Sequence, residues 1–159
     1  MVLVEAAEVE QRDRAAVAAV IAALAARYGN RLATSQALRE QHGHTTTWIE
    51  NQPPDAVVFP QSAEEVQEIV RLCAAHRVPV IGYGTGTSLE GQVNAPRGGI
   101  CLDFRDMNRV LTVHAEDLDC VIEPGPKSVP NRIVLSSKYA MSDLATGSMK
   151  PSAMKCFVC

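Results

Sequence analysis

The stretch that decides the fold is Pro79–Gln92, PVIGYGTGTSLEGQ. An apolar run, Val78–Ile81, leads into it and has the length and composition of a buried β-strand. Three glycines then alternate with other residues, at Gly82, Gly84 and Gly86. Because glycine reaches positive φ angles at little steric cost, such a loop can point several backbone N–H groups at one anion.

Hydroxyl groups extend the donor set of this loop, from Thr85, Thr87 and Ser88. Two common phosphate motifs do not fit it. A P-loop needs a lysine, and the chain has none before Lys127. The dinucleotide fingerprint G-x-G-x-x-G lacks its third glycine. The residues by themselves therefore leave two interpretations open, a phosphate- or nucleotide-binding loop and a tight strand exit shaped by glycine.

A strand and a helix precede the loop. In PPDAVVFP, two prolines lead into a short apolar run, Ala56–Phe59, which predicts a buried strand closed by Pro60. Ser62 and Glu65 have the spacing of a capping box, and an apolar stripe at helical spacing follows. We expect this helix to end near His76. Strand, helix and strand at this length predict a βαβ unit with a parallel strand pair and a right-handed crossover.

Further elements lie on both sides of this unit. Apolar residues at helical spacing predict a helix over Asp13–Tyr28, with Gly29 as its stop signal. Thr34–Glu50 is polar and is expected to be a connector. After the loop, GGICLDF predicts a strand with one apolar face, and RVLTVHAEDLDCVIEPG predicts a hairpin. The fold class is therefore α/β (α+β overall), with a small parallel βαβ core, a hairpin and an N-terminal helix.

Composition changes at Gly125. Residues 1–125 contain ten arginines, seventeen acidic residues and no lysine, whereas the remaining residues contain four lysines, one arginine and a single acid, Asp143. The tail also has no clear hydrophobic period. We expect three regions: a helical segment and connector over 1–52, the α/β part over 53–125, and a divergent, poorly ordered basic tail over 126–159. One hypothesis for the tail is a frameshift or truncation; the other is a natural flexible extension.

Charge and composition exclude several classes of protein. A net charge of −3 argues against a nucleic-acid-binding protein. The longest apolar run, Ala15–Ala26, is too short to cross a bilayer, and acidic residues stand where a secretory signal would have basic ones. Five cysteines without an export signal predict reduced thiols. We expect a cytoplasmic protein without a transmembrane segment.

A family resemblance favours the binding interpretation of the loop. The stretch from PPDAVVFP through the glycine loop, followed by GGICLDFRDMNRVLTV and CVIEPG, resembles the first half of the FAD-binding domain of the p-cresol methylhydroxylase/vanillyl-alcohol oxidase superfamily (PCMH-type). It is most similar to the branch of D-lactate dehydrogenases and glycolate oxidase FAD subunits. The resemblance runs from about Val17 to Gly125 and implies the first lobe of such a domain.

The resemblance also implies site residues. In this family the matching loop wraps the FAD pyrophosphate with main-chain N–H groups. The implied cradle is Gly82, Tyr83, Gly84, Thr85, Gly86, Thr87 and Ser88. Pro60 and Gln92 are weaker candidates for nearby flavin contacts. The loop contains no histidine or cysteine, so the implied FAD is non-covalent.

The activity implied by the resemblance is that of an FAD-linked oxidoreductase for small D-2-hydroxy acids such as D-lactate or glycolate, with hydride transfer to flavin N5. After Gly125 the family pattern of a glycine- and alanine-rich segment and a substrate domain does not follow, so no catalytic residue is assigned. We expect this chain alone to bind FAD weakly or not at all, and not to turn over. The alternatives are a non-catalytic nucleotide-binding module and an inactive truncated product; the hydroxy acid, electron acceptor and any partner subunit are unspecified.

The remaining candidates receive no chemistry at this stage. His42 and His44 form H-x-H, but no cysteine or acidic cluster lies nearby in sequence to complete a metal site, which favours a polar connector. Asp103 and Glu123 have no visible acid/base partner. His76 and His114 are expected in solvent. The cysteines at 73, 101 and 120 are expected to pack as small apolar groups, and the C-x-x-C formed by Cys156 and Cys159 is one pair only.

Overall fold

A computed structural model describes residues 13–45, 47–87, 89–114, 117 and 119–125. The chain divides into two compact units, residues 1–104 and residues 105–159, which are described separately below. The predicted tail, residues 126–159, lies outside the described residues.

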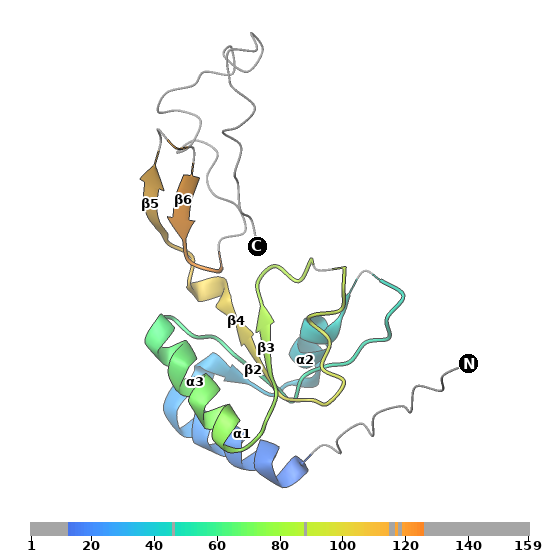
Figure 1. Cartoon of the computed structure of the whole chain (residues 1–159). Helices are drawn as coiled ribbons and strands as arrows, with labels where there is room; N and C mark the ends of the chain where they lie inside the picture. Colours follow the sequence, from blue (N-terminus) through green and yellow to red (C-terminus); the bar gives the residue numbers. More distant parts are fainter. Residues whose placement is uncertain (1–12, 46, 88, 115–116, 118, 126–159) are drawn as a thin grey trace, which may run out of the picture. The chain divides into compact units, whose positions relative to one another are not determined.

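The first unit is built on a four-stranded sheet in the order β1-β2-β4-β3 (Figure 1). Its strands are β1 (Leu32–Ala33), β2 (Ala56–Val58), β3 (Val80–Tyr83) and β4 (Ile100–Asp103). β2, β3 and β4 are parallel, and β1 is antiparallel to β2. The predicted α/β class and parallel core are confirmed.

One detail of the predicted core is wrong. β2 and β3, the strands before and after the helix Ala63–Ala75 in sequence, do not pair with each other. β4 lies between them and pairs with both. β4 is buried along its whole length, since all four of its residues, Ile100–Asp103, are buried. A strand that is covered on both faces is typical of the middle of a parallel sheet.

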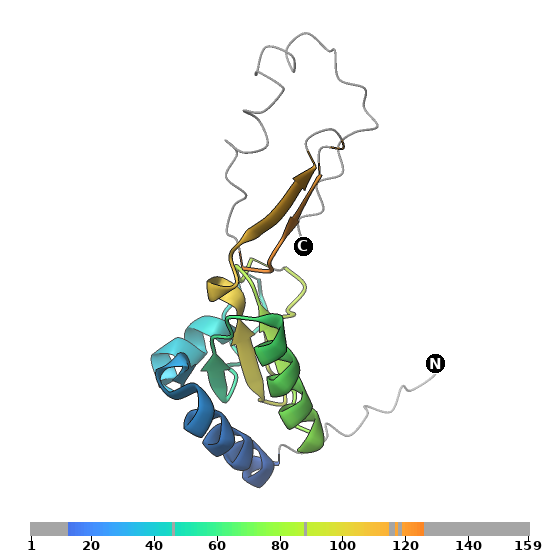
Figure 2. The same ribbon diagram turned by 90° about the vertical axis from the view of Figure 1, so that its left-hand side faces the viewer.

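Helices cover both faces of the sheet (Figures 1 and 2). α1 (Arg14–Tyr28) and α3 (Ala63–Ala75) pack on one face, where their apolar stripes meet alternate residues of β2 and β4. This core contains Val17, Val20, Leu24, Tyr28, Ala56, Val58, Ile69, Cys73, Val78, Ile100 and Leu102. α2 (Gln36–Gly43) contacts β2 and contributes His42 to the opposite face.

α1 forms as the sequence predicts. The Asp13 side chain accepts hydrogen bonds from the N–H groups of Ala15 and Ala16, and Gly29 ends the helix with φ +52. A short 3₁₀ turn, Gly29–Arg31, then leads into β1. The helix buries one stripe only, and its other faces are mainly exposed alanine.

α3 begins and ends where predicted, and its C-terminal cap was not predicted. Ser62 Oγ accepts a hydrogen bond from the N–H of Glu65 at 3.3 Å, which confirms the cap. At the other end, the N–H groups of Arg77 and Val78 donate to the carbonyls of Ala74 and Cys73. This is a Schellman motif with a non-glycine residue, Arg77, in the left-handed region at φ +54.

The predicted connector Thr34–Glu50 is wrong over half its length. Residues Gln36–Gly43 form α2, and its last turn is buried at His42 and Gly43. Gly43 has no room for a side chain, since an added Cβ would lie 2.6 Å from Cα of Pro53. The helix is polar because only this end of it is buried, so its apolar stripe is too short to detect.

The second unit contains the predicted hairpin. β5 (Val110–His114) pairs antiparallel with β6 (Asp119–Ile122), with an irregularity of register between Val110 and Thr112. The 3₁₀ turn Phe104–Asp106 lies at the junction of the two units in sequence. Part of the turn between the strands lies outside the described residues.

Glu123 has a partner in this unit, contrary to expectation. Its carboxylate accepts hydrogen bonds from the Arg109 backbone N–H at 2.8 Å, from Nε at 2.9 Å and from Nη2 at 2.6 Å. These bonds to Arg109 lower the pKa of the Glu123 carboxyl below its usual value. The pair closes the open end of the hairpin, where sequence spacing alone does not show it.

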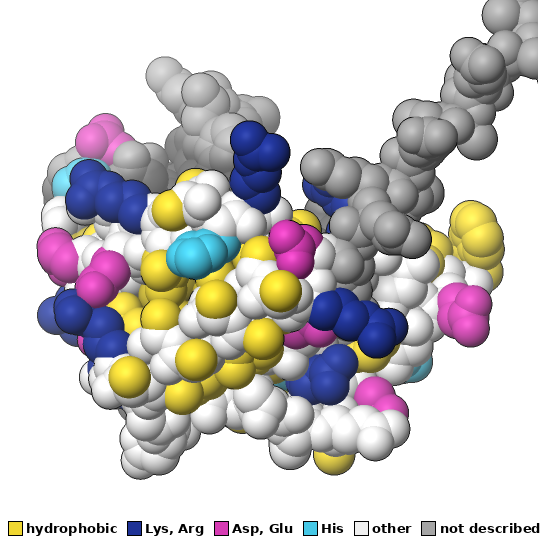
Figure 3. Space-filling view, turned by 90° about the horizontal axis from the view of Figure 1, so that it is seen from below, with side chains coloured by type: hydrophobic (Ala, Val, Ile, Leu, Met, Phe, Trp, Pro, Cys, Tyr) yellow, Lys and Arg dark blue, Asp and Glu magenta, His cyan; other side chains and the backbone are white. Residues whose placement is uncertain are grey.

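The surface of the molecule is mixed. Figure 3 shows a face on which hydrophobic side chains gather between arginine and acidic side chains. Apolar atoms make up more than half of the surface of an ordinary folded protein, so this face by itself indicates no binding site. Among the described residues, no helix has the length and hydropathy needed to cross a membrane.

Candidate functional site

The candidate site lies where the three parallel strands end. β2, β3 and β4 run in the same direction, so Pro60, the glycine loop and Phe104 all follow carboxyl ends at the same edge of the sheet. In open α/β sheets, ligands bind in the crevice outside these ends. The topology therefore brings two separate sequence candidates, Pro60 and the loop, to the edge where a ligand is expected.

Gly86 is the loop glycine whose conformation is special. It has φ +72, and an added Cβ would lie 2.7 Å from Cζ of Tyr83 and closer still to the Tyr83 hydroxyl. Gly82 and Gly84, which are also described, do not have positive φ. A Cβ at Gly82 would make an ordinary contact of 3.5 Å with Phe104. Of the three alternating glycines, Gly86 therefore has the left-handed backbone, and Gly82 and Gly84 contribute the absence of a side chain.

The loop presents hydrogen-bond donors. Within the described part of the chain, the N–H groups of Gly86 and Thr87 meet no hydrogen-bond acceptor. The hydroxyls of Thr85 and Thr87 lie 3.0 Å apart, and both residues are exposed. Ser88, the last predicted cradle residue, lies outside the described residues. Available N–H groups and exposed hydroxyls fit the chemistry of a phosphate or pyrophosphate ligand.

The two weaker candidates differ in exposure. Pro60 is fully buried directly after β2. Gln92 is exposed in the segment that returns from the loop toward β4. That segment is tied down next to Gln92, because the Asn94 amide donates to the carbonyls of Gly43 at 3.1 Å and Glu50 at 3.2 Å.

A buried polar pair lies beside the loop, and sequence reasoning missed it. His42 Nε2 lies 2.8 Å from Asp103 Oδ2, and both side chains are at most 2% exposed. His42 Nδ1 lies 2.8 Å from the Leu38 carbonyl oxygen. The His42 ring also packs against the Tyr83 ring, with the centroids 4.4 Å apart. The prediction that His42 belongs to a connector is wrong, and Asp103, for which the sequence shows no acid/base partner, meets the His42 imidazole.

Two weak signals in the sequence point toward this pair. Leu38 and His42 are four residues apart, so they share a helix face. Asp103 alternates out of phase with Ile100 and Leu102, which places it on the opposite face of β4. Neither signal identifies its partner, because 61 residues separate the histidine from the aspartate.

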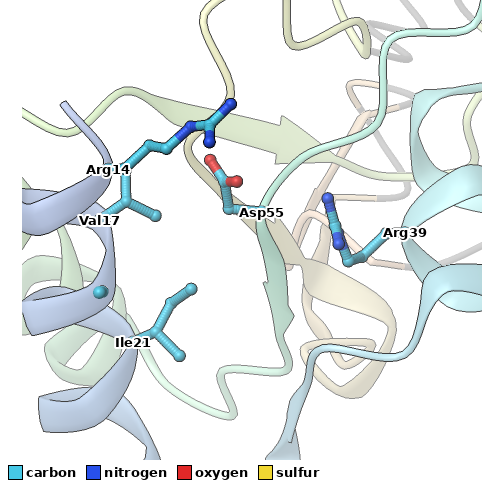
Figure 4. A pocket seen from close by; sticks show the side chains of 6 residues that line it. Arg14, Val17, Ile21, Arg39 and Asp55 are labelled. Carbon is cyan, nitrogen blue, oxygen red and sulfur yellow. The ribbon is translucent and has the colours of Figure 1, made fainter. Parts of the chain in front are cut away.

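A hollow at the other edge of the sheet has a structural role. It has a volume of about 290 Å³ and is lined by Arg14, Val17, Ala18, Ile21, Arg39 and Asp55 (Figure 4). Asp55 precedes β2, so this is the edge of the amino ends. Asp55 Oδ2 accepts from the Gly99 N–H at 2.7 Å, and Arg39 Nε donates to the Pro54 carbonyl at 2.6 Å. These groups fix the loops that enter β2 and β4.

The three described cysteines, at 73, 101 and 120, are buried or half-buried free thiols. Burial raises the pKa of Cys73 to about 11 and that of Cys101 to about 12, so neither is a thiolate at neutral pH. Both pack as the predicted small apolar groups, and Cys120 is half-buried. Cys156 and Cys159 lie outside the described residues. His76 and His114 are exposed, as expected. The described residues contain no group of three or more histidine, cysteine or acidic side chains that could hold a metal ion.

Comparison with known proteins gives a family match and similar sequences. Residues 54–152 of the chain match the FAD binding domain family. A probable mitochondrial D-lactate dehydrogenase of Danio rerio is 46% identical over 94 residues, which are 59% of this chain and 19% of that protein. Glycolate oxidase subunit GlcD of Bacillus subtilis strain 168 is 34% identical over 101 residues, 64% of this chain and 22% of that protein. The chain thus spans about a fifth of the length of these relatives.

Solved structures show the same fold. The chain of p-cresol methylhydroxylase with substrate bound superimposes with a TM-score of 0.58 and 21% sequence identity. The match covers 72% of this chain and 23% of that one. At this level of identity the likeness concerns the fold, and it confirms the predicted first lobe of a PCMH-type domain.

Proposed function

The chain belongs to the FAD-binding domain family, and from that premise we propose that its glycine loop holds the pyrophosphate of FAD. The observation that supports this is Gly86. Its backbone is left-handed, it has no space for a side chain, and its N–H and that of Thr87 are available as donors. Gly82, Tyr83, Gly84, Thr85 and Ser88 complete the proposed cradle, with Pro60 and Gln92 as further candidates.

We propose that this FAD serves an oxidoreductase that acts on a small D-2-hydroxy acid, such as D-lactate or glycolate. The relatives named D-lactate dehydrogenase and glycolate oxidase support this proposal. FAD, when bound, supplies the hydride acceptor. The residues of this chain bind and orient it: the loop provides neutral N–H and hydroxyl donors, which hold an anion without a fixed positive charge. No residue of the described part is assigned as the base that takes the hydroxyl proton.

Two finer points are also proposals. The first is a cytoplasmic location, although the relative from Danio rerio is named as mitochondrial. The second is the division into residues 1–52, 53–125 and a divergent tail over 126–159. The change in composition at Gly125 supports it. The family match extends to residue 152, so the nucleotide sequence around codon 125, translated in all frames, is the appropriate test.

The cradle is tested with Gly86→Val and a matched control. The purified chain is titrated with FAD, and binding is followed by quenching of flavin fluorescence at concentrations high enough to detect weak affinity. Gly86→Val adds a side chain at φ +72 that collides with Tyr83. We expect the affinity for FAD to fall at least about tenfold.

The control is Gly29→Val, which places the same side chain at another left-handed glycine, φ +52 at the end of α1, with open space around it. It also places a β-branched side chain at a positive φ, and no atom lies within 4 Å of the added Cβ, so it should lower stability and leave FAD affinity unchanged. Equal affinity of Gly86→Val and the wild type, or equal losses in both variants, would exclude the loop as the cradle.

A further inference from the structure

The His42–Asp103 pair lies beneath the glycine loop in a chain of contacts. Asp103 is the register partner of Tyr83, the last residue of β3. The His42 ring packs on the Tyr83 ring with an interplanar angle of 46°. The Tyr83 ring in turn occupies the space where a side chain at Gly86 would lie. These contacts connect a fully buried pair to Gly86, a loop residue with left-handed backbone.

The hydrogen bonds of His42 determine how the ring is held. Nδ1 faces the Leu38 carbonyl, which can only accept, so Nδ1 carries a proton and donates. Nε2 faces a carboxylate oxygen at 2.8 Å, so one further proton lies between Nε2 and Oδ2. With both nitrogens bonded, the ring has one orientation. Phe59 limits it from another side, edge-on with the centroids 6.4 Å apart.

The backbone around His42 is equally constrained. Gly43 packs against Gln52 and Pro53 with no space for a Cβ. Asn94 donates to the Gly43 carbonyl. A buried pair of this kind adds little net stability compared with apolar side chains, so its value lies in the geometry that it imposes.

We propose that the His42–Asp103 pair is a positioning group for the glycine loop: it fixes the Tyr83 ring, and the ring fixes the backbone at Gly86 in the conformation that presents the Gly86 and Thr87 N–H groups. The inference rests on the proposed function for its ligand, the FAD pyrophosphate. A loop that is held in its binding conformation before the ligand arrives loses less conformational entropy on binding.

The test compares three variants by NMR without ligand. His42→Leu/Asp103→Val replaces both members by apolar side chains, so neither is left buried without the other, and the variant is expected to fold. Asp103→Asn retains a bond, because the Asn amide can donate to Nε2 of a neutral ring. Val20→Ala, on α1 at the opposite face of the sheet, is the control for lost stability.

The readouts are the ¹⁵N order parameter of Gly86 and the ring-current shift of its Hα under Tyr83. In the double variant we expect the order parameter of Gly86 to fall from about 0.85 to below about 0.6, and the ring-current shift of its Hα to disappear. Asp103→Asn and Val20→Ala should keep wild-type values. A double variant that keeps both readouts, or a Val20→Ala variant that loses them equally, would overturn the proposal.

Titration with FAD then separates this inference from the proposed function. If the loop is the cradle, the double variant binds FAD about tenfold more weakly, and Asp103→Asn stays within about twofold of the wild type. If the wild type binds no FAD, the proposed function fails, while the order parameters still decide whether the pair positions the loop. Unchanged FAD affinity in a double variant with a loosened loop would overturn the role in ligand binding.

Discussion

At the scale of single residues, two positions share a left-handed backbone and differ in what occupies it. Gly86 has φ +72 and faces the Tyr83 ring, so glycine is required there by both strain and space. Arg77 has φ +54 at the end of α3, where its side chain is exposed. Strain alone applies at Arg77, and it is tolerated because the Schellman hydrogen bonds hold the turn.

Replacing Arg77 by glycine should therefore stabilise the chain. We expect Arg77→Gly to raise the free energy of unfolding by about 0.5–1 kcal/mol, since the left-handed strain disappears and only a solvent-exposed side chain is removed. Urea denaturation at neutral pH measures it. His76→Gly is the matched control, because His76 has an ordinary φ of −99 one residue earlier and should lose stability. A gain in both variants, or a loss in both, would contradict the assignment of strain to Arg77.

At the scale of elements, the start of α3 is joined to the turn before β1. Arg31 Nη1 and Nη2 donate to the two Glu65 carboxylate oxygens at 2.7 and 2.8 Å. Glu65 Oε2 also accepts from the Gln61 N–H at 2.7 Å, rather than from Ser62 as a complete capping box would have it. The same carboxylate thus fixes the entry into the helix and the position of the helix against the sheet.

This tie predicts a pH dependence. The Arg31 hydrogen bonds lower the pKa of Glu65 below its usual value, so its contribution to stability is present above the unfolded-state pKa, about 4.3. It is lost as the pH falls through the folded-state pKa. We expect Glu65→Gln to lower the free energy of unfolding by about 1 kcal/mol at pH 7 and by progressively less below about pH 4.

Urea denaturation of both proteins across this pH range measures the difference. Glu68→Gln serves as the control, because its partner Arg27 is 61% exposed and the pair lies in solvent. The free energy of unfolding of Glu68→Gln should stay within about 0.5 kcal/mol of the wild-type value. If the loss of stability in Glu65→Gln grew as the pH falls, the predicted direction of this pH dependence would be wrong.

At the scale of the first unit, the two faces of the sheet have different tasks. The face under α1 and α3 is wholly apolar and supplies the hydrophobic core. The face under α2 contains the His42–Asp103 pair, which lies next to the proposed ligand edge. Alternation along β4 separates the two, since Ile100 and Leu102 point one way and Asp103 the other.

A core substitution should accordingly affect stability without affecting the loop. Leu24 is 2% exposed on α1, and Leu24→Ala should cost about 2–5 kcal/mol. Ile69→Val, a milder change on α3, should cost about 0.5–1.5 kcal/mol and keeps the test possible if the first variant unfolds. Denaturation gives the cost, and FAD titration of the folded protein should give wild-type affinity. A parallel fall of affinity and stability would show that the two faces are coupled.

Local patterns predicted much of this protein. The helices at 14–28 and 63–75, the parallel strands β2, β3 and β4, and the hairpin follow from hydrophobic period, caps and glycine stops, which depend on neighbours only a few residues away. The glycine loop and the family resemblance were also recognised from the sequence, and the family is confirmed. α2 was missed because a helix buried at one end has too short an apolar stripe to show a period.

The sequence by itself determined most of the helices and strands, apart from α2 and β1, and which loop exposes its backbone, because these follow from local sterics and hydrogen bonding. Only the tertiary structure decided that β4 lies between β2 and β3, that His42 meets Asp103, and that Glu123 meets Arg109. It also decided that Gly86, and not Gly82 or Gly84, is the left-handed glycine. Such pairings depend on where the packed core brings distant segments together, and no spacing along the chain encodes that.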